Sequence, residues 1–127
     1  MRAGIIGEIG CSWAKRGSVT PSEEKVLRGA ARAQARTRAP LNIHPYFLTK
    51  NALTPLKILR EEGAELTKVA VSHLDTFLDI DYHKQIAETG AYVEYDCFGV
   101  DWTFEKMPYP PPGFQVDFPK DVDRIKA

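Results

Sequence analysis

The feature that most constrains the fold of this chain is a repeated order of one short apolar run followed by one helix-like stretch. The runs are of strand length and cover residues 4–10, 40–45, 68–73 and 91–96. Strands that alternate with helices indicate βα units around a parallel sheet. Each run carries a polar residue near its end, and steps of 36, 29 and 23 residues separate these residues, which suits such units. They are Glu8, His44, His73 and Asp96.

The stretches between the runs carry helix start and stop signals. Residues 20–23 (TPSE) predict a helix start with a capping threonine, and the helix is expected to bury a face of Val26, Leu27, Ala30, Ala31 and Gln34. Thr54 and Pro55 form a second helix start of the same kind, a capping residue followed by a proline, and Gly63 is expected to end this second helix. A short helix is predicted at 81–88, a loop at 107–118 and the beginning of a helix at 121–127.

Four parallel strands and about three helices amount to half of a (β/α)₈ barrel, whose usual size is about 250 residues. We therefore expect an α/β fold, a partial TIM barrel, in which residues 1–127 form a single partial domain truncated at both ends.

Composition excludes several classes of function. Seventeen basic and 17 acidic residues cancel, so no bulk charge attracts the chain to nucleic acid or to a membrane surface. The apolar runs are far shorter than the roughly 18 residues that a membrane span needs. Two cysteines, Cys11 and Cys97, are too few for a disulfide framework, and the first residues lack the pattern of a signal peptide. We expect a cytoplasmic protein.

The residues at the strand ends suit a transition-metal site. Imidazole and carboxylate are natural ligands of Zn²⁺ and similar ions. A lone histidine at a strand end also occurs as a structural or surface group. Glu8, inside an isoleucine-rich run, is harder to explain without a cation or hydrogen-bond donors, because a buried unpaired carboxylate costs several kcal/mol.

Five segments in order resemble the phosphotriesterase family, and in particular its phosphotriesterase-related proteins in the amidohydrolase superfamily. They are residues 4–13 (GIIGEIGCSW), 20–28 (TPSEEKVLR), 43–45 (IHP), 72–75 (SHLD) and 92–96 (YVEYD) with Phe98 and Gly99. The resemblance runs over nearly the whole chain and corresponds to about strands four to seven of the family's barrel.

The resemblance implies a metal-dependent hydrolase. Family members hold two metal ions at the mouth of the barrel, and a carboxylate of the fourth strand bridges them. Glu8 stands at that position, and His44 and His73 stand at the positions that bind the second ion. A metal-bound water would then attack a small ester, lactone or amide. Zn²⁺ is the expected ion, although Mn²⁺ and Co²⁺ accept the same ligands.

The chain also departs from the family pattern. The His-x-His pair of the family's first strand and the aspartate of its eighth strand, which hold the first ion, have no counterpart. Three histidines are present, and His83, beside Lys84 on a predicted helix, is interpreted as a surface residue. We therefore expect one partial metal site completed by water.

Other candidates have two interpretations each. Asp75 could hydrogen-bond a ligand histidine or cap the next helix, and Asp96 could face the pocket or bind loop amides. Both are retained as supporting catalytic residues beside Glu8. Cys11 is expected to be a small buried residue. Four aromatic residues could line a substrate pocket or belong to the core, namely Tyr95, Phe98, Trp102 and Phe104.

The sequence fits three functions to different degrees. The first is a hydrolase of a small-molecule substrate that carries part of a metal centre. The second is a catalytically inactive half-barrel that acts as a binding module or forms a homo-oligomer through its exposed barrel edges. The third, a dinucleotide-binding domain, is disfavoured because residues 7–11 (GEIGC) lack the G-x-G-x-x-G spacing and carry a carboxylate that would repel phosphate.

Overall fold

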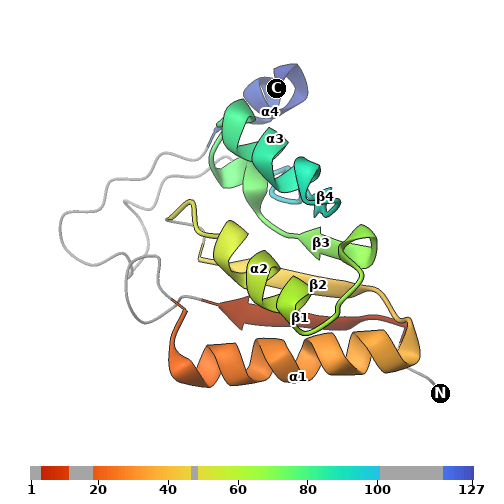
Figure 1. Cartoon of the computed structure of the whole chain (residues 1–127). Helices are drawn as coiled ribbons and strands as arrows, with labels where there is room; N and C mark the ends of the chain where they lie inside the picture. The colour runs from red at the N-terminus through yellow and green to blue at the C-terminus, as the bar shows by residue number, and fades with distance from the viewer. Residues whose placement is uncertain (1–3, 12–18, 47–48, 101–118) are drawn as a thin grey trace.

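The computed structural model describes residues 4–11, 19–46, 49–100 and 119–127. They form a four-stranded parallel sheet with its strands in chain order and helices between them (Figure 1). The strands are β1 (Ile6–Cys11), β2 (Leu41–Pro45), β3 (Val69–Val71) and β4 (Tyr92–Val93). The helices are α1 (Pro21–Thr37), α2 (Leu53–Glu61), α3 (Ile80–Glu88) and α4 (Asp121–Lys126), with short 3₁₀-helices η1 (Leu66–Lys68) and η2 (Leu74–Thr76). The predicted α/β class is confirmed.

Helix α1 begins where the sequence predicts, because its first turn is capped from both sides. The Thr20 hydroxyl accepts from the Glu23 N–H at 3.3 Å, and the Glu23 carboxylate accepts from the Thr20 N–H at 2.7 Å. This reciprocal pair satisfies two of the main-chain N–H groups that a helix start leaves without partners. The prediction of a helix start at residues 20–23 is confirmed.

The expected buried face of α1 is correct except at Val26, which is 53% exposed. One residue turns a helix by about 100°, so Val26 points away from the sheet when the adjacent Leu27 packs onto it. Gln34 is buried on this face without being apolar. Its side-chain amide donates to the Glu65 carbonyl at 2.9 Å and accepts from the Glu65 N–H at 3.0 Å. These two bonds satisfy the buried amide and tie α1 to the segment before η1.

The start of α2 differs from the prediction. Thr54 lies inside the helix and the capping position is Ala52, whose side chain makes no cap hydrogen bond. The Ala52 N–H donates instead to the Tyr82 hydroxyl at 2.7 Å, so a side chain from α3 satisfies this group. The end agrees with expectation, because Gly63 follows the helix with φ of +86°.

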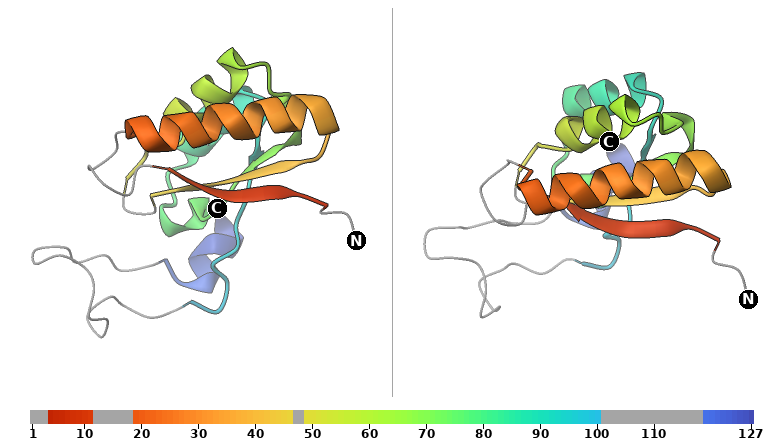
Figure 2. Two further views of the ribbon diagram at one scale, coloured as in Figure 1. Left: turned by 90° about the horizontal axis from the view of Figure 1, so that it is seen from below. Right: turned by 60° about the horizontal axis from the view of Figure 1, so that its bottom comes forward.

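Helices α1 and α2 cover one face of the sheet (Figure 2). The core lies between these helices and the side chains that the strands direct toward them. In β2 the alternation is regular, with Leu41 and Ile43 buried and Asn42 and His44 on the opposite face. The core includes Leu27, Ala31, Leu41, Ile43, Leu56, Leu59, Val69 and Val71. The opposite face of the sheet therefore carries the polar side chains.

Strand β1 contains one extra residue relative to β2. Ile6 pairs with Leu41 and Ile9 pairs with Ile43, so three steps along β1 match two steps along β2. Both isoleucines pack against the core, although their odd spacing would place them on opposite faces of a regular strand. The extra residue therefore keeps both on the helix-covered face, and it leaves Glu8 on the face of His44.

The predicted fourth strand is shorter than expected. The Glu94 N–H still donates to the Val71 carbonyl at 3.0 Å, after which the chain leaves the sheet. The N–H groups of Asp96 and Cys97 donate instead to the Asp75 carboxylate, at 3.4 and 2.9 Å. A side chain thus replaces the neighbouring strand as acceptor.

Several expectations lie outside the described residues. They concern Trp102, Phe104 and the loop at 107–118. Among the described residues, no helix combines the length and the apolar character that a membrane crossing requires.

Gly7 is the residue at which the extra step of β1 can be tested. Its φ is +126°, and a Cβ there would lie 2.3 Å from the Asn42 carbonyl oxygen. We expect Gly7→Ala to lower the free energy of unfolding by about 1–3 kcal/mol or more, measured by urea denaturation. Gly10→Ala in the same strand is the control, because a Cβ at Gly10 meets nothing within 4 Å. Equal effects of the two substitutions would contradict the description of β1.

The buried Tyr82 gives a prediction about alkaline pH. Burial raises the pKa of its phenol to about 12, above the ordinary value of 10. The neutral phenol is therefore favoured by folding, and this stabilisation is present below pH 10 and is lost as the pH rises toward 12. At about 1.4 kcal/mol per pKa unit the loss is roughly 2–3 kcal/mol.

The measurement compares the chain with Tyr82→Phe. At neutral pH the variant should unfold more easily by about 1–3 kcal/mol, because the buried Ala52 N–H loses its acceptor. The difference in the free energy of unfolding should shrink between pH 10 and 12, because the side chain at position 82 can ionise in the unmodified chain and not in the variant. A difference that is constant over this range would argue against a buried neutral phenol.

Candidate metal centre

Three side chains from successive βα units converge on the polar face of the sheet. Nδ1 of His44 lies 3.2 Å from Oε2 of Glu8, and Nε2 of His73 lies 3.4 Å from Oε1 of Glu8. The two ring nitrogens are 3.1 Å apart. The structure therefore brings together the three residues that the sequence proposed as ligands.

Each of the three side chains is placed by a different local device. Glu8 reaches this face through the extra residue in β1, and His44 reaches it through the regular alternation of β2. His73 lies two residues beyond β3, and its left-handed backbone, with φ of +60°, turns the chain out of the strand direction. Because the carboxyl ends of parallel strands lie at one edge of the sheet, the three side chains lie close together there.

The donor set fits a divalent cation. A tetrahedral ion with nitrogen and oxygen ligands at about 2.0–2.1 Å requires donor separations of about 3.3 Å. The two ring nitrogens, 3.1 Å apart, approach that requirement, and one donor atom from each of the three residues lies within 4.8 Å of the others. One carboxylate with two neutral imidazoles is also a ligand set that Zn²⁺ accepts.

Asp96 contacts the other side of the His73 ring. Its Oδ1 lies 2.9 Å from Nδ1 of His73 and accepts from the His73 N–H at 3.1 Å. A carboxylate only accepts, so in the neutral ring the proton belongs on Nδ1, and Nε2 presents its lone pair to Glu8 and His44. Of the two expectations for Asp96, the structure supports neither in full, because this carboxylate orients a candidate ligand.

Asp75 does not take the expected place beside a histidine, nor does it cap the following helix. It is fully buried, and its carboxylate accepts from the N–H groups of Asp96 and Cys97 and pairs with Nε of Arg124 at 3.0 Å. The expectation was wrong because spacing along the chain does not fix direction, and η2 turns this side chain away from the ring.

A cluster of three polar side chains near the candidate ligands was not predicted from the sequence; it consists of Asn42, Ser72 and Glu94. Ser72 donates to the Asn42 carbonyl oxygen at 2.6 Å, and the Asn42 amide donates to Glu94 at 3.0 Å. The alternation of β2 gave a signal for Asn42, since it shares a face with His44. Ser72 and Glu94 gave no such signal, because they lie just beyond strands that are too short to show an alternation.

The surroundings of Glu8 favour its charged form. Burial alone would raise its pKa, but hydrogen bonds with Ser72 and His44, and the charges of His44 and His73, lower the pKa below the ordinary 4.5. Its side chain is 41% exposed, which leaves the carboxylate accessible. An anionic, accessible carboxylate beside two imidazoles is what cation binding requires.

Cys97 lies beside the same histidine but is not activated. Its Sγ is 3.9 Å from Nδ1 of His73 and 3.5 Å from the Asp96 carboxylate. Burial and the charges of Asp75 and Asp96 raise the pKa of the thiol to about 12. The thiol is therefore neutral at physiological pH and weakly nucleophilic.

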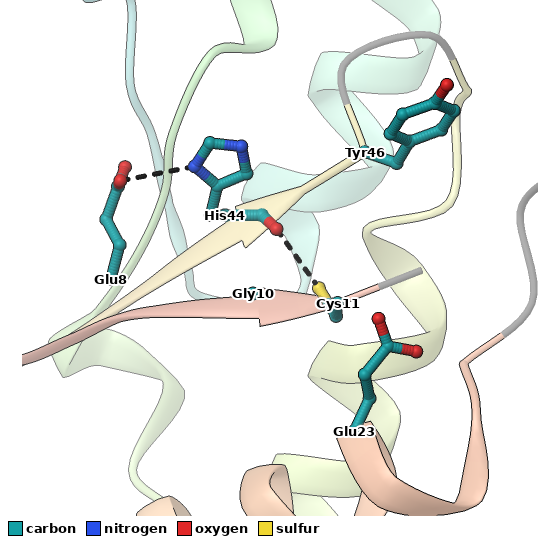
Figure 3. Close-up of a pocket in the computed structure, with 6 residues that line it drawn as sticks. All are labelled: Glu8, Gly10, Cys11, Glu23, His44 and Tyr46. Atoms are coloured by element: carbon teal, nitrogen blue, oxygen red, sulfur yellow. Dashed lines mark hydrogen bonds and ion pairs between the residues drawn. The ribbon is translucent and has the colours of Figure 1, made fainter. Parts of the chain in front are cut away.

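A pocket of about 370 Å³ adjoins the candidate ligands (Figure 3). Glu8 and His44 point toward each other on one side of it, and Tyr46 lies on the other. Cys11, 3% exposed, is buried as expected, and its thiol donates to the His44 carbonyl at 3.5 Å. Gly10 and Glu23 complete the lining.

The interpretation of His83 as a surface residue was wrong. It is 5% exposed; Nε2 lies 3.0 Å from the Leu74 carbonyl, and Nδ1 lies 2.7 Å from the Tyr95 hydroxyl. The neighbouring Lys84 is exposed, but the two residues point in different directions around α3. Tyr95 thus has a structural partner, and Phe98 is 49% exposed.

The sheet, the helices on one face and the polar groups at the strand ends define a partial TIM barrel with a candidate metal centre at its mouth. A model of the phosphotriesterase family matches residues 1–127. The chain therefore belongs to the phosphotriesterase family.

The chain is also similar in sequence and in structure to known proteins. The chain is 41% identical over 130 residues to N-acetyltaurine hydrolase of Xenopus tropicalis. This alignment covers 99% of this chain and 34% of that protein. A resiniferatoxin-binding protein from Rhodobacter sphaeroides has a TM-score of 0.82 at 37% identity, over 98% of this chain and 32% of that one. A lactonase from Listeria monocytogenes has a TM-score of 0.68 at 35% identity, over 87% and 30%. The chain spans about a third of the curated relatives' length.

The environment of Glu8 gives a prediction about its titration. In the metal-free chain, the carboxyl of Glu8 should titrate below pH 4.5, as followed by carbon-13 NMR. His44→Ala should raise this pKa, because it removes both a hydrogen bond and a charge that favour the carboxylate. Ser22→Ala, an exposed serine of α1, should leave it unchanged. A Glu8 pKa that does not respond to His44→Ala would contradict the contact.

Proposed function

We propose that this chain belongs to a metal-dependent hydrolase of a small ester, lactone or amide, and that it supplies Glu8, His44 and His73 to the metal centre. The observation that carries the proposal is the convergence of these donors, whose ligand atoms all lie within 4.8 Å of one another. Relatives named for amide and lactone hydrolysis support the reaction class.

The three residues would divide the work of holding the ion. Glu8 would supply the negative charge that favours a divalent cation at this place. His44 and His73 would add neutral imidazole ligands through Nδ1 and Nε2, the nitrogens that face Glu8. When bound, a divalent cation supplies Lewis acidity, which polarises a carbonyl and lowers the pKa of water. Zn²⁺ is the ion we favour.

The remaining polar residues would orient the ligands rather than react. Asp96 would keep the proton of His73 on Nδ1, and Asp75 would hold the main chain of Asp96. The pocket beside His44 would receive the substrate, with Tyr46 at its far side. The neutral thiol of Cys97 has no part in this proposal.

The alternative is a module without catalysis that associates through its sheet edges. Strands β1 and β4 are the edges of the described sheet, and an exposed edge favours pairing with another chain. Metal binding separates the two proposals, because edge association needs no ion at the candidate centre.

Zinc content is the first measurement. We expect about one Zn²⁺ per chain after loading and desalting, counted by elemental analysis. Glu8→Gln and His44→Ala should each lower the zinc content severalfold, because each removes one of three ligands. Glu88→Gln, an exposed glutamate of α3, is the matched control and should retain the metal.

The reaction class is tested in the same preparations. An aryl ester, a small lactone and an N-acetyl amide are offered to the zinc-loaded and the chelator-treated chain. Turnover that depends on zinc and is lost in His73→Ala supports the hydrolase. Zinc retained at full stoichiometry in the Glu8 and His44 variants would refute the site, and a chain that neither binds zinc nor turns over any substrate would favour the alternative.

A further inference from the structure

A buried arginine lies behind the candidate metal centre. Arg124 of α4 is 2% exposed, and its Nε pairs with the fully buried Asp75 at 3.0 Å. Its Nη1 donates to Asp121 at 2.6 Å, and its Nη2 donates to the Val100 carbonyl at 3.4 Å. A planar guanidinium with several donors is suited to hold such groups in a fixed arrangement.

Asp75, Asp121 and Arg124 all hydrogen-bond to the main chain of one turn, residues 96–100. Asp75 accepts the N–H groups of Asp96 and Cys97. Asp121 accepts the N–H of Gly99 at 3.0 Å, and Arg124 binds the carbonyl of Val100. We call Asp75, Asp121 and Arg124 the clamp. It contacts four of the turn's main-chain groups, and these bonds replace the sheet pairing that ends after Glu94.

The turn held by the clamp carries Asp96, and Asp96 holds His73. Its carboxylate contacts both the ring Nδ1 and the main-chain N–H of His73. The main chain around His73 is also held by other bonds, since its carbonyl accepts from the Thr76 N–H at 3.2 Å and from the Thr76 hydroxyl at 2.7 Å. Asp96 contacts both the main-chain N–H and the ring of His73, so it restrains the direction of the ring. Arg124 is thus connected to Nε2 of His73 through Asp75, the turn and Asp96.

Net stability is a poor explanation for these buried charges. A buried ion pair recovers little more than its desolvation penalty, and apolar residues of similar volume often serve stability as well. The hydrogen bonds that the guanidinium donates to Asp121 and to the Val100 carbonyl, by contrast, fix direction. The clamp is therefore better explained by the geometry that it imposes on the turn.

We propose that Arg124 is a positioning residue for the candidate ligand His73, which it orients through Asp75 and the 96–100 turn. This rests on the proposed metal site, where outer partners of ligating histidines commonly change metal affinity by about 10- to 100-fold. Arg124 acts further out than Asp96, through Asp75 and the turn, so we expect an effect at the lower end of this range, about tenfold.

The test uses Arg124→Met, which keeps an unbranched apolar side chain but removes the charge and the donors, and Arg124→Lys, which keeps the charge without the guanidinium fork. The control is Tyr82→Phe, which removes a buried hydrogen bond to the Ala52 N–H and none of the bonds made by the clamp. The first readout is the nitrogen-15 NMR shift of both His73 ring nitrogens in the metal-free chain at about pH 8.5, well above the ordinary histidine pKa of about 6.5. The second is the dissociation constant for Co²⁺.

In the unmodified chain we expect the proton of His73 on Nδ1. Arg124→Met should mix the two tautomers and weaken Co²⁺ binding about tenfold. Arg124→Lys should fall between the two, and Tyr82→Phe should change neither readout although it lowers stability. A merely structural role of Arg124 would lower stability without a shift in the tautomer.

The outcomes separate this inference from the proposed function. If the unmodified chain binds no Co²⁺, the metal site is refuted while the tautomer shift still tests the clamp. If Co²⁺ binds and Arg124→Met changes neither readout, the role of Arg124 is refuted. Should Arg124→Met fail to fold, Arg124→Lys and Asp121→Asn decide, and unchanged tautomers in both would overturn the inference.

Discussion

The candidate site depends on one extra residue in the first strand. Ile6 and Ile9 must both pack against the helices, yet a regular strand would place them on opposite faces. The bulge between them resolves this conflict, and Gly7 allows it because no Cβ could fit beside the Asn42 carbonyl. The same step leaves Glu8 on the polar face next to His44. The packing of the core and the position of the carboxylate are therefore consequences of a single local irregularity.

Behind this face, polar groups are arranged in successive layers. Glu8, His44 and His73 form the innermost one, and Asp96 fixes the ring of His73. Asp75 then holds the main chain on which Asp96 is carried. Each layer acts on the next by hydrogen bonds, and those of the fully buried Asp75 lie where direction matters more than net energy. The fourth β-strand is short because its continuation is committed to this arrangement.

Features set by local patterns were predictable from the sequence. The capping box at Thr20 and the alternation in β2 depend on residues a few positions apart, and both were predicted correctly. Features set by direction in space were not. The buried state of His83 and the contact of Asp75 with the turn depend on how elements more than ten residues apart are packed. The convergence of the three candidate ligands was predictable because parallel strands share one edge, although the bulge that brings Glu8 there was not.

The left-handed backbone of His73 has a consequence for how this site could change over time. A residue with a Cβ is held there at a cost of roughly 1–2 kcal/mol, which glycine would not incur. Histidine at this position is therefore a compromise between conformational ease and the ring it provides. Glycine would avoid this cost but would remove the ring, so a histidine kept here in a lineage would be a record of selection on the chemistry at this edge of the sheet.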